Sequence, residues 1–202
     1  MKLLFSCLVP LVFLIGCGKQ EISGQVFVVT QGAGNIKLAL VEVGAIPLEE
    51  FEKFYKEKKE FKEIQKKMLL PKYEAAKKEV DNAFGKLRVG VGITFEKNYK
   101  DYLKIEEKNS GIIKEYETFE TQEYYLKSLP AAKMTGKSDA DGRFLLALPK
   151  GKYVIVANSS RKVGDSTESY QWLVKIDVTQ SGDLMLSNDN MLDTQCKECI
   201  RL

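Results

Sequence analysis

The residue types that most often carry chemistry are few in this chain, and one is missing altogether. The sequence of 202 residues contains four cysteines and no histidine. Without imidazole, a His-ligated zinc ion and every Ser-His or Cys-His catalytic arrangement are excluded. A c-type haem is also excluded, because Ile200 rather than histidine follows the Cys196-x-x-Cys199 pair. We therefore predict no cofactor, no metal site and no enzymatic activity.

Asp139, Asp141 and Gly142 have the spacing at which a calcium-binding loop begins. A complete loop also needs further oxygen ligands and a distal glutamate, and here Arg143 and Phe144 follow instead. A β-turn explains the same residues, because aspartate accepts hydrogen bonds from the backbone just after it and glycine tolerates a positive φ. The motif therefore favours a hairpin turn over a calcium site.

The N-terminus has the composition of an export signal. Lys2 precedes an apolar run from Leu3 to Ile15 that contains Pro10 and is followed by the small residue Gly16. A membrane-spanning helix needs about 20 apolar residues, which is more than this run provides. Residues 1–16 are therefore predicted to be a secretory signal peptide.

The four residues Leu14-Ile15-Gly16-Cys17 resemble the lipobox of bacterial lipoproteins. The resemblance implies that Cys17 is diacylated, becomes the new N-terminus and is acylated again, with residues 17–21 as a short tether. Two or three acyl chains hold a protein stably on a bilayer, whereas one chain does so only marginally. The expected location is the bacterial cell envelope. Gly18 rather than aspartate follows Cys17, which favours the outer membrane in a species with two membranes.

With Cys7 in the signal peptide and Cys17 lipidated, Cys196 and Cys199 are the cysteines left in the exported chain, within a tail of residues 191–202. An oxidising compartment favours a local disulfide between them. A redox-active pair is an alternative, although such pairs usually begin a helix in a βαβ fold. A cysteine-only metal site would need a second copy of the chain to supply two more thiolates.

Composition indicates one folded domain with a large insertion. Hydrophobic residues make up 44% and aromatic residues 10% of the chain, enough for a packed core. The formal charge is only +3, with charges of both signs interspersed. A nucleic-acid partner therefore has no electrostatic support.

Two segments have the alternating pattern of β-strands, residues 22–45 and residues 131–190. In the second, one strand face is predicted to carry Phe144, Leu146 and Leu148, and another is predicted to carry Tyr170, Trp172, Val174, Ile176 and Val178. Between them, residues 46–130 change to the helical period after Pro47. The predicted helices are 48–70, ended by Pro71, then 71–84, 95–108 and 112–127, the last two divided at Asn109-Ser110-Gly111. Residues 85–92 are ambiguous, since Leu87, Val89 and Val91 also alternate as in a strand.

Residues 137–157 contain an Asp-x-Asp-Gly-x-Phe turn, an alternating strand and a Pro-x-Gly-x-Tyr turn. This order, with Ser23–Val28 as a first strand, resembles the carboxypeptidase regulatory-like domain. The resemblance implies an antiparallel, transthyretin-like β-sandwich of structural or adhesive use. The predicted fold class is accordingly α+β, a sandwich of about seven strands with a long helical insertion between the second and third.

Aromatic residues offer two minority interpretations. Trp172, with Tyr153 and Tyr170 nearby, would suit a sugar-stacking platform, but the alternation favours core packing. The Tyr116, Phe119, Tyr124 and Tyr125 stretch favours a helix packing face over a ligand groove.

The sequence as a whole predicts a membrane-anchored, non-enzymatic envelope lipoprotein whose helical insertion contacts an envelope protein or the cell wall. A thiol–disulfide redox protein using Cys196 and Cys199, or a carbohydrate-binding sandwich, are the alternatives.

Overall fold

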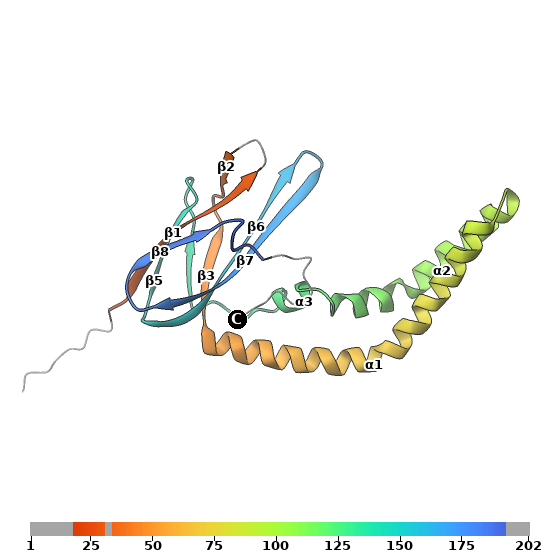
Figure 1. Ribbon diagram of the computed structural model, residues 1–202, viewed down its shortest axis with the longest axis horizontal. Helices are drawn as coiled ribbons and strands as arrows, with labels where there is room; N and C mark the ends of the chain where they lie inside the picture. Colours follow the sequence, from red (N-terminus) through yellow and green to blue (C-terminus); the bar gives the residue numbers. More distant parts are fainter. Residues whose placement is uncertain (1–17, 31–33, 193–202) are drawn as a thin grey trace, which may run out of the picture.

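The computed structural model describes residues 18–30 and 34–192 (Figure 1). The predicted signal peptide 1–16, the lipidation candidate Cys17 and the Cys196–Cys199 pair lie outside the described residues. The described chain is α+β, as predicted, with strands before and after a helical insertion. Its elements are β1 (Gln20–Thr30), β2 (Gly34–Lys37), β3 (Glu42–Pro47), α1 (Leu48–Val89), α2 (Ile93–Thr118), α3 (Glu123–Leu126), β4 (Met134–Lys137), β5 (Arg143–Leu148), β6 (Gly151–Val163), β7 (Ser166–Val178) and β8 (Gly182–Leu186).

The strands form two packed sheets, each built from both β-rich segments. One sheet has the order β2-β1-β5, with β8 on the other edge of β1, and the second has the order β4-β3-β6-β7. Every pairing between these strands is antiparallel except that of β1 with β8, where Ile22 pairs with Gly182 and Val26 with Leu186. The parallel pair corrects the all-antiparallel expectation. It arises because the last strand returns to the first by crossing from one sheet to the other.

The sandwich core lies between the sheets and follows the predicted alternation. On β5, Phe144, Leu146 and Leu148 are buried and the residues between them are exposed. On β7, Trp172 is 1% exposed, and its indole N–H donates to the Ser187 carbonyl oxygen over 2.9 Å. The two β-rich segments therefore share one core, as the sequence indicates.

The insertion differs from the prediction in position and in continuity. It leaves from the third strand, since residues 22–45 contain most of three strands rather than two. Pro71 lies inside α1, and Gly111 lies inside α2, so the four predicted helices are two long ones plus the short α3. Figure 1 shows α1 bending near its middle, where Pro71 lies. A proline in a helix costs about 3 kcal/mol. Lys66 and Tyr73, on either side of Pro71, both contact the Tyr116 ring of α2.

The base of α1 packs on the outer face of the second sheet. Pro47 ends β3 and directly precedes the helix, and Glu49 and Glu50 occupy its first turn, where carboxylates complement the helix dipole. A second apolar cluster forms there from four buried residues, with Tyr55 and Leu129 among the partly buried residues around it. Its members are Ile46, Leu48, Phe51 and Val154.

Asp139, Asp141 and Gly142 lie in the turn between β4 and β5. The Asp139 Oδ1 atom accepts from the backbone N–H of Asp141 and of Arg143, each over 2.8 Å. Gly142 has a φ of +75°, and its carbonyl oxygen accepts from the Val26 N–H over 2.8 Å. The turn before β5 is thus hydrogen-bonded to β1.

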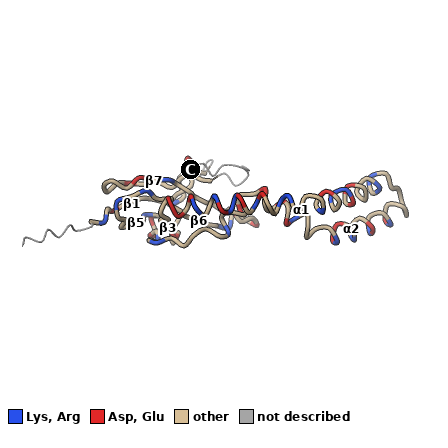
Figure 2. Tube along the Cα trace, turned by 90° about the horizontal axis from the view of Figure 1, so that it is seen from below, with Lys and Arg blue, Asp and Glu red and all other residues tan. Residues whose placement is uncertain are grey.

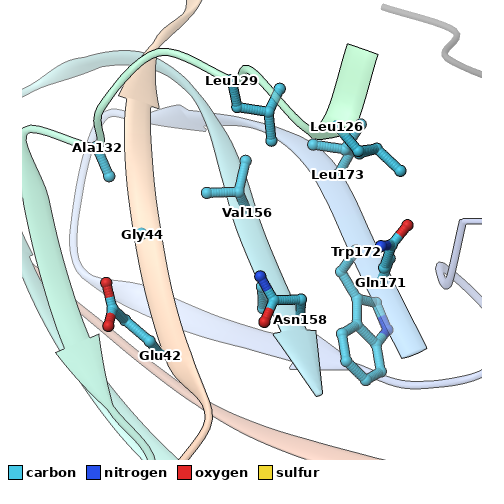
Figure 3. Close-up of a pocket in the computed structure, with 11 residues that line it drawn as sticks. Glu42, Gly44, Leu126, Leu129, Ala132, Val156, Asn158, Gln171, Trp172 and Leu173 are labelled. Atoms are coloured by element: carbon cyan, nitrogen blue, oxygen red, sulfur yellow. The ribbon is translucent and has the colours of Figure 1, made fainter. Parts of the chain in front are cut away.

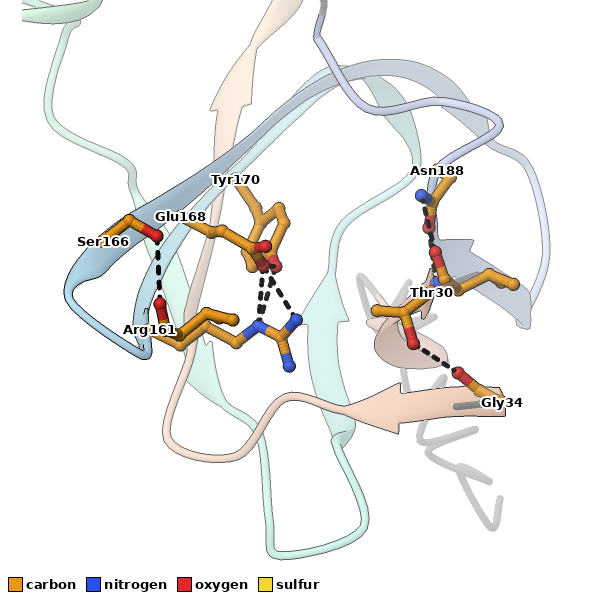
Figure 4. A network of polar contacts seen from close by, with 9 residues as sticks. Thr30, Gly34, Arg161, Ser166, Glu168, Tyr170 and Asn188 are labelled. Atoms are coloured by element: carbon orange, nitrogen blue, oxygen red, sulfur yellow. Dashed lines mark hydrogen bonds and ion pairs between the residues drawn. The ribbon is translucent and has the colours of Figure 1, made fainter. Parts of the chain in front are cut away.

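Further polar contacts lie at the same end of the sandwich (Figure 4). Glu168 accepts a hydrogen bond from the Tyr170 hydroxyl and from Arg161, whose Nη2 lies 2.8 Å from Oε2. Both hydrogen bonds hold the pKa of Glu168 below its usual value. Asn188 donates to and accepts from the Val29 backbone, which extends the β8 side of β1.

Replacing Gly142 by alanine should destabilise the sandwich by about 2–3 kcal/mol, because the residue keeps a positive φ and its new Cβ would lie 2.5 Å from the Val26 carbonyl oxygen. Gly164→Ala is the matched control, since Gly164 has a φ of +61° with open space around it. That control should cost about 1 kcal/mol. Urea unfolding of both variants measures the difference, and equal losses would contradict the close approach to Val26.

Candidate functional site: a projecting helical hairpin and a groove at its base

The feature that most distinguishes this molecule is a helical arm, defined here as α1 and α2. The two helices run antiparallel and pack along each other, and the arm projects well beyond the sandwich (Figures 1 and 2). The start of β1 and the far end of the arm lie at opposite ends of the molecule in both views. At 1.5 Å per residue, the 42 residues of α1 have a contour length of about 63 Å.

Near the base of the arm, lysines of α1 contact tyrosines of α2 and α3. Lys58, Lys62 and Lys66 occur every fourth residue on α1, and each places its ammonium group over a tyrosine ring of the returning chain. The distances to the ring centroids of Tyr124, Tyr125 and Tyr116 are 4.9, 5.7 and 5.8 Å. Cation–π contacts of this kind each stabilise by roughly 0.5–1 kcal/mol at exposed sites.

The aromatic stretch before β4 is a packing surface, as predicted. Tyr125 is 5% exposed and its ring centroid lies 4.8 Å from that of Tyr55, while Tyr116 stacks on Tyr73 at 4.1 Å. Burial raises the pKa of Tyr125 to about 12, because a phenolate would be poorly solvated there. These rings are committed to the arm's own packing.

Farther out, the seam between α1 and α2 is narrow and partly polar. Ala76 and Ala83 are buried in it, and so is Asn109, which is 7% exposed. The Asn109 amide N–H₂ group donates to Glu79 Oε2 over 3.1 Å and to the Ile105 carbonyl oxygen over 2.9 Å. Lys108 also pairs with Glu79, and the two hydrogen bonds, with the nearby ammonium charge, hold the pKa of Glu79 below its usual value.

The far end of the arm is apolar and exposed. We call residues 89–95 the tip; it contains the turn Gly90-Val91-Gly92 and no charged residue. Val89, Val91 and Ile93 are 81%, 84% and 87% exposed. Gly92 has a φ of +59°, which favours glycine at this position just before α2.

A groove lies beside the base of the arm, over the outer face of the second sheet (Figure 3). Its volume is about 310 Å³. The Oε1 atom of Gln171 is buried in the protein without a hydrogen-bond partner. The walls combine sheet residues with the chain that follows α3: Glu42, Gly44, Leu126, Leu129, Ala132, Val156, Ala157, Asn158, Gln171, Trp172 and Leu173.

The sequence-predicted site residues are not brought together. Asp139 and Asp141 take part in the β4–β5 turn, where Lys37 lies 2.6 Å from Asp141. Trp172, Tyr153 and Tyr170 are 1%, 6% and 8% exposed and pack in the sandwich core, which confirms the core-packing interpretation. In residues 18–30 and 34–192, no cluster of three or more metal-ligating side chains occurs. None of the described helices has the length and apolar character needed to cross a bilayer.

Sequence reasoning missed the tip. The alternation of Leu87, Val89 and Val91 suggested a strand as readily as a helix, so residues 85–92 had no assigned role. The available indication was the run Val89-Gly90-Val91-Gly92-Ile93, where two glycines mark a turn and three aliphatic residues surround them.

Comparisons with known proteins add little. No family model and no curated protein matches the chain. Among solved structures, a proposed carbohydrate-binding protein from Pseudomonas aeruginosa aligns over 85% of this chain and 89% of its own, with 13% identity and a TM-score of 0.35. At that TM-score the likeness carries no inference about this chain.

Removing the Asn109 amide should loosen the outer arm without affecting the sandwich. Asn109→Ala removes the two hydrogen bonds of a buried group, which should cost the arm about 1 kcal/mol. Hydrogen exchange of residues 76–83 and 105–112 should accelerate while β5 and β6 stay unchanged. Faster exchange in β5 would contradict a separate arm.

The arm should also loosen in acid through Glu79. Its folded pKa is lowered, so its contribution is present above the unfolded value and is lost as the pH falls below 4.5 and through the folded pKa. The thermal midpoint of the helical signal should therefore drop between pH 5 and pH 3 by less in Glu79→Gln than in the parent. Glu74→Gln, an exposed carboxylate with no ion pair among the described residues, should behave like the parent.

Proposed function

We propose that this protein is a lipid-anchored, non-enzymatic protein of the bacterial cell envelope that uses its helical arm to contact a second surface. Cys17 carries the acyl chains, the sandwich is the supporting body and the arm is the interacting part. The observation that carries the proposal is the arm itself. It projects beyond the sandwich and ends in aliphatic side chains that are more than four-fifths exposed.

The position of β1 supports the anchor. β1 begins at Gln20, three residues after Cys17, so the acyl chains would hold the sandwich close to the bilayer. The start of β1 lies at the end of the molecule opposite the tip. If Cys17 is anchored in one bilayer, the tip would therefore face a second surface away from that bilayer.

The carboxypeptidase regulatory-like resemblance fits the supporting role of the sandwich. Its Asp-x-Asp-Gly-x-Phe segment forms the β4–β5 turn and joins β1 to β5, which is a structural task. The absence of histidine from the whole sequence fits a role without catalysis.

For the carbohydrate-binding alternative, the groove is the candidate binding site. A bound hydroxyl group would satisfy the buried Gln171 Oε1, and Glu42 and Asn158 would supply further polar contacts. The redox alternative depends on Cys196 and Cys199, which lie outside the described residues, and stays a prediction.

The proposed lipid anchor predicts that replacing Cys17 abolishes fatty-acid labelling. Cells given a clickable fatty acid should label the parent protein, whereas Cys17→Ser should lose the label because the thiol is the acylation site. Cys7→Ser, in the predicted signal peptide, should keep the label. Equal labelling of the parent and Cys17→Ser would refute the anchor.

The interaction role predicts that the outer arm can be removed separately. Tyr73 stacks on Tyr116 and Glu79 pairs with Lys108, so the chain can be closed between these pairs. Replacing residues 77–112 with a short Gly-Ser loop keeps the cluster at the base of α1. The thermal midpoint of the sandwich should change by less than about 3 °C, since no core residue of the sheets is lost.

A photo-crosslinking residue at position 91 in the lipidated protein should then form an adduct in living cells. The same residue at Lys59, an exposed position near the base of α1, is the matched control and should form markedly less. An equal adduct yield at both positions would count against the outer arm as the contacting part.

A further inference from the structure

The tip exposes several large aliphatic side chains, although polar residues would form the same turn. Val89, Val91 and Ile93 are each more than 80% exposed and lie within five consecutive residues. In water each of these side chains costs free energy that burial would recover. A partner that removes them from water is therefore expected.

Basic residues surround the tip. Lys86 and Arg88 precede it on α1, and Lys97 and Lys100 follow it on α2. Over residues 85–100 the acidic residue is Glu96, so this end of the arm is clearly positive while the chain as a whole is close to neutral. Figure 2 shows the turn itself free of charged residues, with charged positions of both signs beginning behind it.

The side-chain types near the end of the arm suit the interfacial layer of a bilayer. Aliphatic residues occupy the end, and aromatic and basic residues are interleaved behind them. The aromatic rings are those of Phe84, Phe95 and Tyr99, each 45–47% exposed. Phe95 and Tyr99 are two and six residues from Ile93, the first residue of α2, or about 3 and 9 Å along the helix. Aromatic rings concentrate at the membrane interface, and basic side chains reach the headgroups.

The direction of α1 adds to this argument, whereas on α2, which begins at the tip, Lys97 and Lys100 lean toward the turn. Side chains on a helix lean toward its N-terminus, and α1 ends at the tip. Lys86 and Arg88 therefore lean away from the turn, toward the level where headgroup phosphates would lie.

We propose that the tip of the arm inserts into the interfacial layer of an anionic lipid bilayer, with Lys86, Arg88, Lys97 and Lys100 on the headgroups. The inference deepens the proposed function and rests on the arm being its contacting part. A lipid surface fits better than a protein partner, because the turn is a narrow, convex end (Figure 1). A stable protein interface usually needs about 20–30 residues on each side.

Vesicle flotation tests the inference with the chain from Gly18 to Leu202, which contains every described residue and lacks Cys17. Vesicles of phosphatidylcholine with 30% phosphatidylglycerol should carry the protein, and pure phosphatidylcholine vesicles should carry at least about tenfold less, with the difference shrinking at high salt. Because Cys17 is absent, this result is independent of the labelling result for the anchor.

Two pairs of variants locate the binding. Val91→Asp with Ile93→Asp should lower the partition coefficient at least about tenfold, because two charges replace the inserted side chains. Met68→Asp is the matched control, since Met68 is 66% exposed on the same arm but lies far from the tip. Lys86→Glu with Arg88→Glu should remove the preference for anionic vesicles, whereas Lys56→Glu with Lys59→Glu should leave it within about twofold.

Depth supplies a separate readout. The tryptophan of Val91→Trp should be quenched by brominated acyl chains and that of Met68→Trp should not, while Trp172 in the core serves as the constant background.

No flotation, or flotation unchanged by the tip variants, would overturn the inference. It would also be overturned if the tip variants only dissociated a dimer in sedimentation, because the tip would then bind a second copy of the chain. If vesicle binding fails while position 91 still forms protein adducts in cells, the proposed function stands and only the lipid partner is wrong.

Discussion

A small apolar cluster at the base of α1 holds the two parts of this molecule in one arrangement. Ile46, Leu48, Phe51 and Val154 are all nearly or fully buried on the outer face of the second sheet. Pro47 joins β3 to α1 without a loop, so the helix direction is set by that packing rather than by a flexible link. Wherever the tip makes contact, this cluster fixes its position relative to the start of β1.

Beyond the base, the arm depends on a single seam between two helices. Alanines and one asparagine are buried along it, and lysine–tyrosine contacts flank it near the base. The buried Asn109 of α2 donates to Glu79 of α1 and so links facing positions of the two helices. The same thin packing leaves the aliphatic tip uncovered, which is the surface that we propose makes contact.

Much of the sandwich could be predicted, because strand alternation is a local property of the sequence. Phe144, Leu146 and Leu148 face inward on β5, and Trp172 is in the core, as their spacing indicated. The helix boundaries could not be predicted as well. Pro71 disfavours a helix by about 3 kcal/mol and Gly111 by about 1 kcal/mol, and contacts between distant residues outweighed both.

The sequence alone determined the absence of histidine chemistry, the lipobox-like residues before Cys17, the inward faces of the strands that became β5 and β7, and the charged character of the insertion. The tertiary structure decided that β8 pairs parallel with β1, that the insertion is one bent hairpin, and that Val91 and Ile93 stay exposed at its end. The division has a physical reason. Periodicity is set by neighbours along the chain, whereas exposure depends on which distant segments pack against a residue.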